Sequence, residues 1–239
     1  MKAPRDRGIP MARAPCPRGY RWRAFALYVL YQSLLQVRGY RIRLAQTDQE
    51  RDQVYRLRWQ VYTEAGYLDP ARFPDGRFRD RADAVSFSWL AWWKGEPVGT
   101  VRATPLKYGI APVFEYVHDL EEVRAIQDRA LELGRYAIVR AHRKGLIGAG
   151  LLLRAFVWAI RRAYAYLVWG ASRSVTPRVR EFSPEMREIP IAASQLRPTD
   201  ILGYFRKHPQ VSVYIVPTCR FRFAAWLRFL AKRVKALVP

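Results

Sequence analysis

The segment from Arg135 to Trp169 constrains the fold most, because it combines two strands, a glycine-rich turn and a long apolar helix. The predicted strands are Arg135–Val139 and Tyr166–Trp169, and the helix between them runs from about Gly150 to Ala163. Glycine is unfavourable inside a helix or strand. Three glycines within positions 145–150 therefore predict a turn at which the backbone approaches another group closely.

The rest of the chain adds further strands and helices to this unit. Tyr40–Leu44 alternates as a strand, and Thr47-x-x-Glu50 is a capping box that begins a helix. Ser86–Trp93 and Val98–Ala103 predict a hairpin. The remaining elements are a helix around Leu120–Leu131, an irregular segment at 171–197, a short helix at Pro198–Phe205, a strand at Val211–Val216 and a helix at Phe221–Leu237. This order predicts one α/β (α+β) domain with a mixed central sheet flanked by helices.

Charge divides the chain into three parts. The formal net charge is +22, yet residues 1–46 hold ten Lys and Arg against one acid, and residues 201–239 hold eight and no acid. Basic flanks predict an anionic partner: a membrane, nucleic acid or an acidic protein. Because no nucleic-acid-binding motif is present, we do not expect nucleic acid. We expect a disordered basic tail (1–20), a globular domain (21–220) and a basic amphipathic C-terminal helix (221–239).

Two apolar segments could contact either a membrane or the core. In the C-terminal helix the apolar stripe is Phe223, Trp226, Leu227, Leu230, Val234 and Leu237, and the basic stripe is Arg228, Lys232 and Lys235. Such a helix can lie in a membrane interface. Ala24–Val37 is apolar over about 14 residues, which is too short to span a bilayer. We expect a cytoplasmic protein, with possible peripheral association with an anionic membrane at its inner face.

Cysteine and histidine patterns predict neither a disulfide framework nor a metal site. The two cysteines are Cys16 and Cys219, and the histidines are His118, His142 and His208. None of these residues has the spacing of metal ligands. A reducing compartment, and no cleaved signal peptide, are the expected setting.

Several charged residues occupy positions at which burial is expected. Arg58 lies on the apolar stripe of the helix that begins at Thr47, and a buried guanidinium needs a carboxylate partner. Asp80, Asp83 and Glu132 are the candidates. They could form a structural ion network, a substrate site, or both, by ordering a loop over a substrate.

The segment from Glu132 to Arg135 predicts an irregular strand. The two residues are separated by an odd number of positions, so a regular strand would place them on opposite faces. Gly134 between them could permit a bulge that brings both side chains to one face. Arg135 could also pair directly with Glu132.

Four motifs connect these residues to a known family. They are Arg58-x-x-x-Tyr62, Asp80-x-x-Asp83-x-x-Ser86, Gly99-Thr100-Val101-Arg102 and Glu132-x-x-Arg135-x-Ala137-x-Val139. In this order, over roughly residues 40–170, the chain resembles the autoinducer-synthase and long-chain N-acyl amino acid synthase branch of the GNAT superfamily. Homoserine-lactone synthases usually carry phenylalanine and tryptophan where this chain has Tyr62 and Leu68. The N-acyl amino acid synthases are therefore the closer group.

The resemblance implies a GNAT-like acyltransferase and assigns candidate roles. Glu132 would be the catalytic base, since only a free amine attacks a thioester. The candidate substrate-binding residues are Arg58, Tyr62, Asp80, Asp83, Arg102 and Arg135. The candidate residues for the phosphopantetheine of the acyl donor are Val139, Arg143, Lys144, Gly148 and Gly150, in a turn that presents backbone N–H groups to a phosphate. Tyr204, Tyr214 or another tyrosine could protonate the leaving thiolate.

The donor turn favours an acyl carrier protein over coenzyme A. The family signature has a basic residue where this chain has Gly145, and the carrier protein offers a single phosphate to bind. Carrier proteins are acidic, so basic residues would steer them. We expect transfer of a long-chain fatty acyl group from an acyl carrier protein to the amine of an amino acid, with no tightly bound cofactor. The alternatives are a coenzyme-A-dependent N-acetyltransferase and a non-catalytic module on membranes or nucleic acid.

Overall fold

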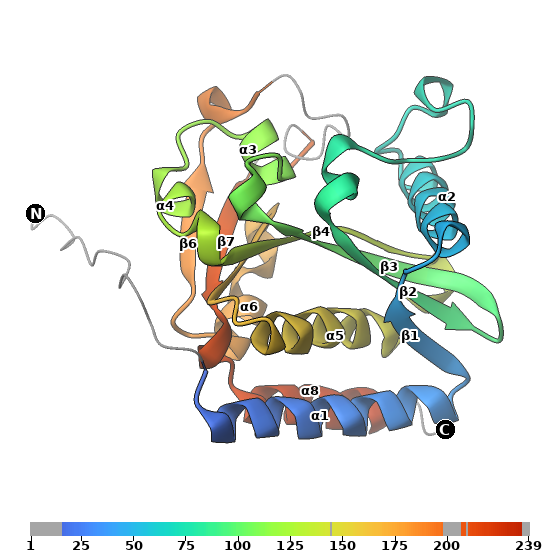
Figure 1. Cartoon of the computed structure of the whole chain (residues 1–239), viewed down its shortest axis with the longest axis vertical. Helices are drawn as coiled ribbons and strands as arrows, with labels where there is room; N and C mark the ends of the chain where they lie inside the picture. Colours follow the sequence, from blue (N-terminus) through green and yellow to red (C-terminus); the bar gives the residue numbers. More distant parts are fainter. Residues whose placement is uncertain (1–15, 144, 198–206, 209, 236–239) are drawn as a thin grey trace, which may run out of the picture.

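A seven-stranded mixed sheet forms the centre of the molecule, as predicted (Figure 1). The computed structural model describes residues 16–143, 145–197, 207–208 and 210–235. The strand order is β1-β2-β3-β4-β5-β7-β6, and only β4 and β5 pair in parallel. The strands are β1 (Tyr40–Leu44), β2 (Phe87–Trp93), β3 (Glu96–Pro105), β4 (Ala130–Ile138), β5 (Tyr166–Ser172), β6 (Arg187–Ile191) and β7 (Val211–Pro217).

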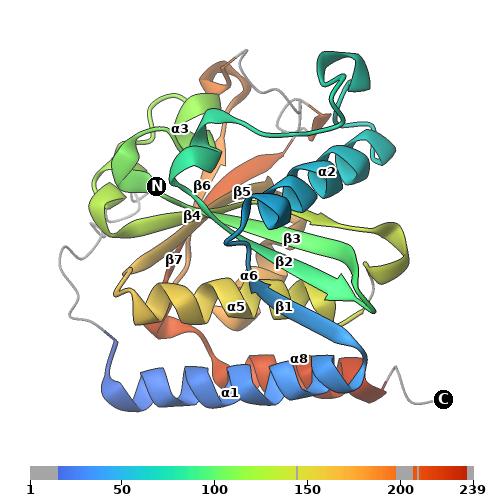
Figure 2. The same ribbon diagram turned by 45° about the vertical axis from the view of Figure 1, so that its right-hand side comes forward.

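Helices cover both faces of this sheet (Figures 1 and 2). On one face lie α2 (Asp48–Glu64), α3 (Pro112–Tyr116) and α4 (Glu121–Arg124). On the other face α5 (Ile147–Arg161) packs against the sheet, and α1 (Arg18–Val37) and α8 (Phe223–Lys235) lie side by side beneath it. The short helix α6 (Thr176–Phe182) contacts α8. None of the helices in the described part of the chain is both long and apolar enough to cross a bilayer.

Two local sequence features shape the helices α2 and α5. The Thr47 hydroxyl accepts a hydrogen bond from the Glu50 N–H (3.2 Å), and the Glu50 carboxylate accepts one from the Thr47 N–H, so the capping box begins α2. Gly150 in the first turns of α5 lets α1 approach closely. A Cβ at this position would lie 2.7 Å from Leu35 and 3.0 Å from Ile42.

β4 contains the predicted bulge. Thr100 of β3 pairs with Ala137, whereas Arg102 pairs with Gly134, so β4 has one extra residue at this point. The extra residue is Arg135, which adopts a left-handed conformation (φ +51°). The bulge turns the Arg135 side chain to the face on which Arg102 lies, and both side chains bind the same aspartate.

The sheet opens between β4 and β5. The two strands pair only from Ala130 and Tyr166 to Glu132 and Val168. Beyond Glu132, β4 continues beside β3 while β5 continues beside β7. The two strands therefore diverge in the middle of the sheet, immediately after the residue predicted to be the catalytic base.

Some predictions of secondary structure are wrong. The helix expected at Leu120–Leu131 is only the four-residue α4, because Ala130 and Leu131 are buried as the start of β4 between β3 and β5. Residues 171–197 are not irregular but contain α6 and β6. The strand β6 is a short edge strand, and such strands carry little sequence pattern.

Two further predictions fall partly or wholly on residues that the structure does not describe. The short helix expected at Pro198–Phe205 lies wholly outside the described residues. The predicted tail at 1–20 overlaps α1, which begins at Arg18, and residues 1–15 lie outside the described part.

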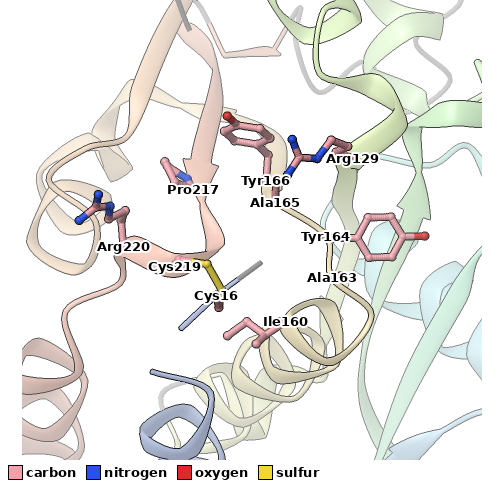
Figure 3. Close-up of a pocket in the computed structure, with 10 residues that line it drawn as sticks. All are labelled: Cys16, Arg129, Ile160, Ala163, Tyr164, Ala165, Tyr166, Pro217, Cys219 and Arg220. Carbon is pink, nitrogen blue, oxygen red and sulfur yellow. A yellow bond between two sulfur atoms is a disulfide. The ribbon is translucent and has the colours of Figure 1, made fainter. Parts of the chain in front are cut away.

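The expectation of unpaired cysteines is also wrong. Cys16 and Cys219 form a disulfide, with their Cα atoms 5.2 Å apart (Figure 3). They are 203 positions apart in the sequence, so their spacing carried no sign of the bond. The disulfide joins the start of α1 to the turn between β7 and α8. The cavity beside it, about 30 Å³, has room for about one water molecule rather than a substrate.

Candidate active site

Three arginines and two aspartates form a buried ion network beneath α2, which we call the charged cluster. Arg58 Nη1 lies 2.7 Å from Asp83 Oδ1. Arg102 Nη1 lies 2.6 Å from Asp80 Oδ1 and 3.0 Å from Asp83 Oδ1. Arg135 donates to Asp80 Oδ2 from both Nε (2.9 Å) and Nη2 (2.7 Å). Of the three carboxylates predicted as partners for Arg58, Asp83 binds it, Asp80 binds the neighbouring arginines, and Glu132 lies outside the cluster. Arg135 pairs with Asp80 and not with Glu132.

The backbone holds both aspartates in place. Asp80 immediately precedes the short 3-10 helix Arg81–Val85, and its Oδ1 accepts from the Ala82 N–H at 3.0 Å. The Asp83 carboxylate in turn accepts from the Asp80 N–H at 2.9 Å. The same two carboxylates thus order the loop and bind the arginines.

The charged cluster stays ionised and has a surplus of positive charge. Burial alone would raise the pKa of Asp80 and of Asp83, but their arginine neighbours lower both pKa values below the ordinary range. Three guanidinium groups therefore face two carboxylates, a net charge of +1. Arg102 Nε and Nη2 are buried and have no acceptor among the described residues.

Glu132 has a different environment from the two aspartates. Its side chain is 6% exposed, and its Oε2 accepts a hydrogen bond from the Val113 N–H at 3.0 Å. Burial raises the pKa of Glu132 to about 7, although the Val113 N–H and the charges of Arg102 and Arg135 act to lower it. Near neutral pH this carboxyl group can accept or donate a proton, as a general base requires.

A cavity of about 620 Å³ begins where β4 and β5 diverge. Its polar end contains Tyr62, Tyr116, Glu132, Gly134 and Arg135. Its apolar end is lined mainly by apolar side chains of α5, β5, the segment 175–182 and the C-terminal segment, namely Leu152, Phe156, Trp169, Val175, Val179, Phe182, Phe221, Trp226 and Phe229. Arg178 of α6 also lines the cavity. Of the charged cluster, only Arg135 reaches the cavity wall. The other four members lie behind it.

The predicted donor turn is only partly at the cavity. Arg143 and Gly148 line the wall, and the Nε of Arg143 donates to the Ile138 carbonyl at 2.9 Å. A Cβ at Gly148 would clash with the hydroxyl group of Tyr136, which therefore lies directly over this turn. Lys144 lies outside the described residues.

Two of the predicted donor residues have other roles in this structure. Gly150 does not line the cavity, its N–H donates to the Leu146 carbonyl at 3.1 Å, and its missing side chain makes room for α1. Val139 does not line the cavity either, and its N–H donates to the Val98 carbonyl at 3.0 Å. Neither N–H is free to bind a phosphate in this conformation.

Sequence reasoning missed several residues of the site. The Tyr116 hydroxyl accepts a hydrogen bond from Arg135 Nη2 at 2.6 Å, and the Val113 N–H binds Glu132. Both precede β4 in a segment without a clear pattern. The apolar end was missed as well, although Val175, Val179 and Phe182 recur at helical spacing, a signal that could have revealed α6.

Of the two tyrosines named from the sequence as candidate proton donors, only Tyr214 lies in the described part of the chain. The Tyr214 hydroxyl is bonded to Thr176 Oγ1 at 2.7 Å, and Tyr214 does not line the cavity. Tyr204 lies outside the described residues. The tyrosines at the cavity are Tyr62, Tyr67, Tyr116 and Tyr136. No group of three or more His, Cys, Asp or Glu side chains in the described part of the chain is arranged to hold a metal ion.

Solved structures share this architecture. The CoA-dependent acyl-homoserine lactone synthase BjaI, solved with MTA, matches with a TM-score of 0.58 at 19% identity, over 82% of this chain and 90% of that chain. FeeM, an N-acyl amino acid synthase from uncultured soil microbes, matches with a TM-score of 0.54 at 14% identity, over 75% and 91%. The AHL synthase LasI matches with a TM-score of 0.50 at 17% identity, over 75% and 90%. At these identities, the likeness shows a shared fold.

The sequence comparison defines the protein more closely. It identifies the chain as an N-acyltransferase. The family model described as N-acyl amino acid synthase FeeM matches residues 53–185, more than half of the chain. The chain therefore belongs to the FeeM family of N-acyl amino acid synthases, as its motifs predicted. A search of curated proteins returned no match.

Proposed function

We propose that this acyltransferase moves a long fatty acyl chain from the thioester of an acyl carrier protein to the amino group of an amino acid. One observation carries the proposal: Glu132 lies in a single cavity that has a cationic end and a long apolar end. An amino acid fits the first end and a fatty acyl chain fits the second. Their reacting atoms would meet beside Glu132.

The cationic end suits the carboxylate of an amino acid. The charged cluster has a net charge of +1, and Arg135 presents it to the cavity. A substrate carboxylate beside Arg135 would balance this charge, which favours binding of an acid over a simple amine. Tyr62 and Tyr116 flank the position with groups that can hydrogen-bond or pack against a side chain.

Glu132 would act as the general base. It takes one proton from the substrate ammonium group, which leaves the free amine to attack the thioester carbonyl carbon. The C–N bond forms as the C–S bond breaks. The attacking nitrogen loses its second proton, and the departing thiolate sulfur gains one, so the products are an amide and a free thiol. The pKa of about 7 lets Glu132 release its proton to water before the next turnover.

The apolar end favours a long chain over an acetyl group. Each methylene that leaves water for an apolar site contributes about 0.8 kcal/mol. An acetyl group would leave the side chains between α5, α6 and α8 without contacts. This argues against a simple N-acetyltransferase.

The positive charge of the chain favours a carrier protein as donor. The formal net charge is +22, and Arg143 lies at the cavity wall beside the glycine turn. An acidic carrier protein would be attracted over a wide area, and its single phosphate would need only a small binding turn. Coenzyme A carries more phosphate groups but offers no protein surface for this charge to attract.

Product analysis with matched donors tests the proposal. Hexadecanoyl groups are supplied on acyl carrier protein or on coenzyme A, together with a mixture of the standard amino acids, and products are identified by mass spectrometry. We expect an N-hexadecanoyl amino acid, formed faster from the carrier protein, with an advantage that shrinks as salt is added. Equal or faster turnover of acetyl-CoA would contradict the proposal.

A further inference from the structure

The helix α1 is apolar on its outer side as well as on its inner side. Its inner residues Ala24, Leu27, Tyr31 and Leu35 are buried against the domain. On the outer side Trp22 is 62% exposed and Phe25 is 40% exposed, and Val29 and Leu30 one turn further along are also exposed. Neighbouring large apolar side chains that are exposed to water mark an interaction surface. The outer side of α1 therefore resembles an interface without its partner.

The C-terminal helix α8, for which both a membrane and a core contact were expected alternatives, packs largely on the core in its first half. Trp226 and Leu230 of the predicted apolar stripe are buried in the core, and Phe223 packs against it, so this part of the stripe packs on the domain. Leu227 is 48% exposed, and the side chains of Val234 and Leu237 lie outside the described part. The exposed apolar surface thus belongs mainly to α1. Since α1 and α8 lie side by side, their outer sides form one surface, the α1–α8 face (Figures 1 and 2).

The charged residues of α1 and α8 are all basic. Neither α1 nor α8 contains an acidic residue. The exposed basic residues of these two helices and the residue before α8 are Arg18, Arg21 and Arg23 at the start of α1, and Arg222, Arg228 and Lys232 in and before α8. An aromatic and aliphatic row flanked by basic residues is the pattern of a helix that lies in a membrane interface.

We propose that the α1–α8 face binds the surface of an anionic lipid bilayer, with Trp22 and Phe25 inserted at the boundary between headgroups and acyl chains. A second copy of this chain fits less well, because a symmetric contact would place these basic residues opposite one another without any acid. An acidic protein would match the charges but has no need of the exposed aliphatic row. An anionic bilayer satisfies both features.

If the proposed function holds, the position of the α1–α8 face relative to the cavity gives a reason for the protein to bind a membrane. Trp226 and Phe229 of α8 line the apolar end of the cavity. A bilayer docked on the α1–α8 face would therefore lie one helix away from the bound acyl chain. Long-chain acyl amino acids are poorly soluble in water, and release close to a membrane would shorten their path to lipid.

Vesicle flotation tests the proposal without any assay of activity. The full-length, disulfide-bonded protein is mixed with vesicles of phosphatidylcholine alone, or with vesicles that also contain phosphatidylglycerol. We expect flotation with the anionic vesicles and little with the neutral ones. Trp22→Ala combined with Phe25→Ala should weaken binding about tenfold. Arg18, Arg21 and Arg23 changed together to Gln should weaken it about 100-fold, since each basic residue contributes about a factor of five.

A matched variant on the opposite side of the sheet controls for net charge. Arg51, Arg56 and Arg72 are exposed on and beside α2, and their joint change to Gln removes the same charge. Binding should be almost unchanged. Equal loss in this control, equal binding to neutral vesicles, or no effect of the Trp22 and Phe25 changes would overturn the proposal. So would light scattering that shows a dimer dependent on Trp22, or a carrier protein that binds this face while anionic vesicles do not. Circular dichroism and thermal unfolding confirm that each variant is folded.

Discussion

The two ends of the cavity are built in opposite ways. At the polar end, each aspartate of the charged cluster is held by backbone N–H groups and by guanidinium groups at fixed distances. At the apolar end, most of the lining side chains are apolar and come from several elements. Directional contacts fix a geometry, whereas apolar contacts mainly depend on volume and area. The polar end is thus suited to select one head group, and the apolar end to accept a range of chains up to a limiting length.

The same difference predicts how each end responds to substitution. A buried charge that loses its partner is strongly destabilising, because the remaining charge is left in a medium of low dielectric. An apolar wall tolerates changes of side chain when the total volume is similar. Substitutions at the polar end should therefore affect folding and catalysis, while those at the apolar end should change selectivity.

Removing the proposed base, Glu132, should have the largest effect. Glu132→Gln keeps the shape of the side chain but cannot accept the ammonium proton, so kcat/KM should fall by about 10²–10⁴-fold. Glu122→Gln, at a partly exposed residue outside the cavity, is the control and should leave the rate near that of the wild type. A folded Glu132→Gln enzyme with full activity would remove Glu132 from the proposed mechanism.

Breaking the charged cluster should mainly lower the stability of the protein. Asp80→Asn removes the negative charge that binds both Arg102 and Arg135. We therefore expect the free energy of unfolding to fall by about 3–5 kcal/mol. Asp52→Asn is the matched control, because Asp52 binds Arg56 and Arg77 at the surface. That change should cost less than about 1 kcal/mol. Urea unfolding measures both, and equal losses would mean that burial of the cluster has no special role.

The raised pKa of Glu132 also predicts a dependence of stability on pH. Below its unfolded pKa of 4.5 the group is protonated in both states, so the raised folded pKa of about 7 has no effect. From about pH 4.5 to pH 7 the unfolded chain loses this proton while the folded protein keeps it. The free energy of unfolding should therefore fall over this range, by roughly 3 kcal/mol at one pKa unit per 1.4 kcal/mol.

Comparison with Glu132→Gln isolates this contribution. The variant lacks the titrating group, so its stability relative to the wild type should increase between pH 5 and pH 8. The aspartates of the charged cluster do not interfere, since their lowered pKa values confine their loss of stability to more acidic solution. A constant difference between the two proteins over this range would contradict the raised pKa.

A bulkier residue at the apolar end should change selectivity with the smallest effect on rate. Val179→Phe places a larger side chain on the cavity wall formed by α6 and leaves less space for the acyl chain. The preferred acyl chain should therefore become shorter. The kcat/KM for the longest accepted chain should fall about tenfold, which is the loss of about two buried methylenes. Val37→Phe, at a residue that is 85% exposed, is the control and should leave the chain-length profile unchanged. An unchanged profile in Val179→Phe would place the chain elsewhere.

The sequence revealed the polar end much better than the apolar end, for a physical reason. Arg58 on an apolar stripe predicted a carboxylate partner, and Gly134 between Glu132 and Arg135 allowed a bulge. The resemblance to the family supplied the remaining substrate-binding candidates. Few carboxylates were candidate partners for these arginines, because buried carboxylates are rare. The sequence could not show which cluster members reach the cavity, since that depends on the bulge at Arg135 and on the divergence of β4 and β5.

The apolar end depends on contacts between distant segments. Its walls bring α5, α6 and α8 together, and apolar side chains carry no sign of which neighbours they will meet. The disulfide between Cys16 and Cys219 shows the same limit, because it joins opposite ends of the chain. The glycine turn shows another. Gly150 fitted a phosphate-binding pattern, but its lack of a side chain serves the close packing of α1 on α5.

A crystal structure of the enzyme with its own N-acyl amino acid product tests the central claim most directly. We predict the product carboxylate beside Arg135, the amide nitrogen within hydrogen-bond distance of Glu132 directly or through one water, and the end of the chain between α6 and α8. The amide would then mark the point where β4 and β5 diverge. A product whose carboxylate lies away from Arg135, or whose chain lies outside the cavity, would contradict the account.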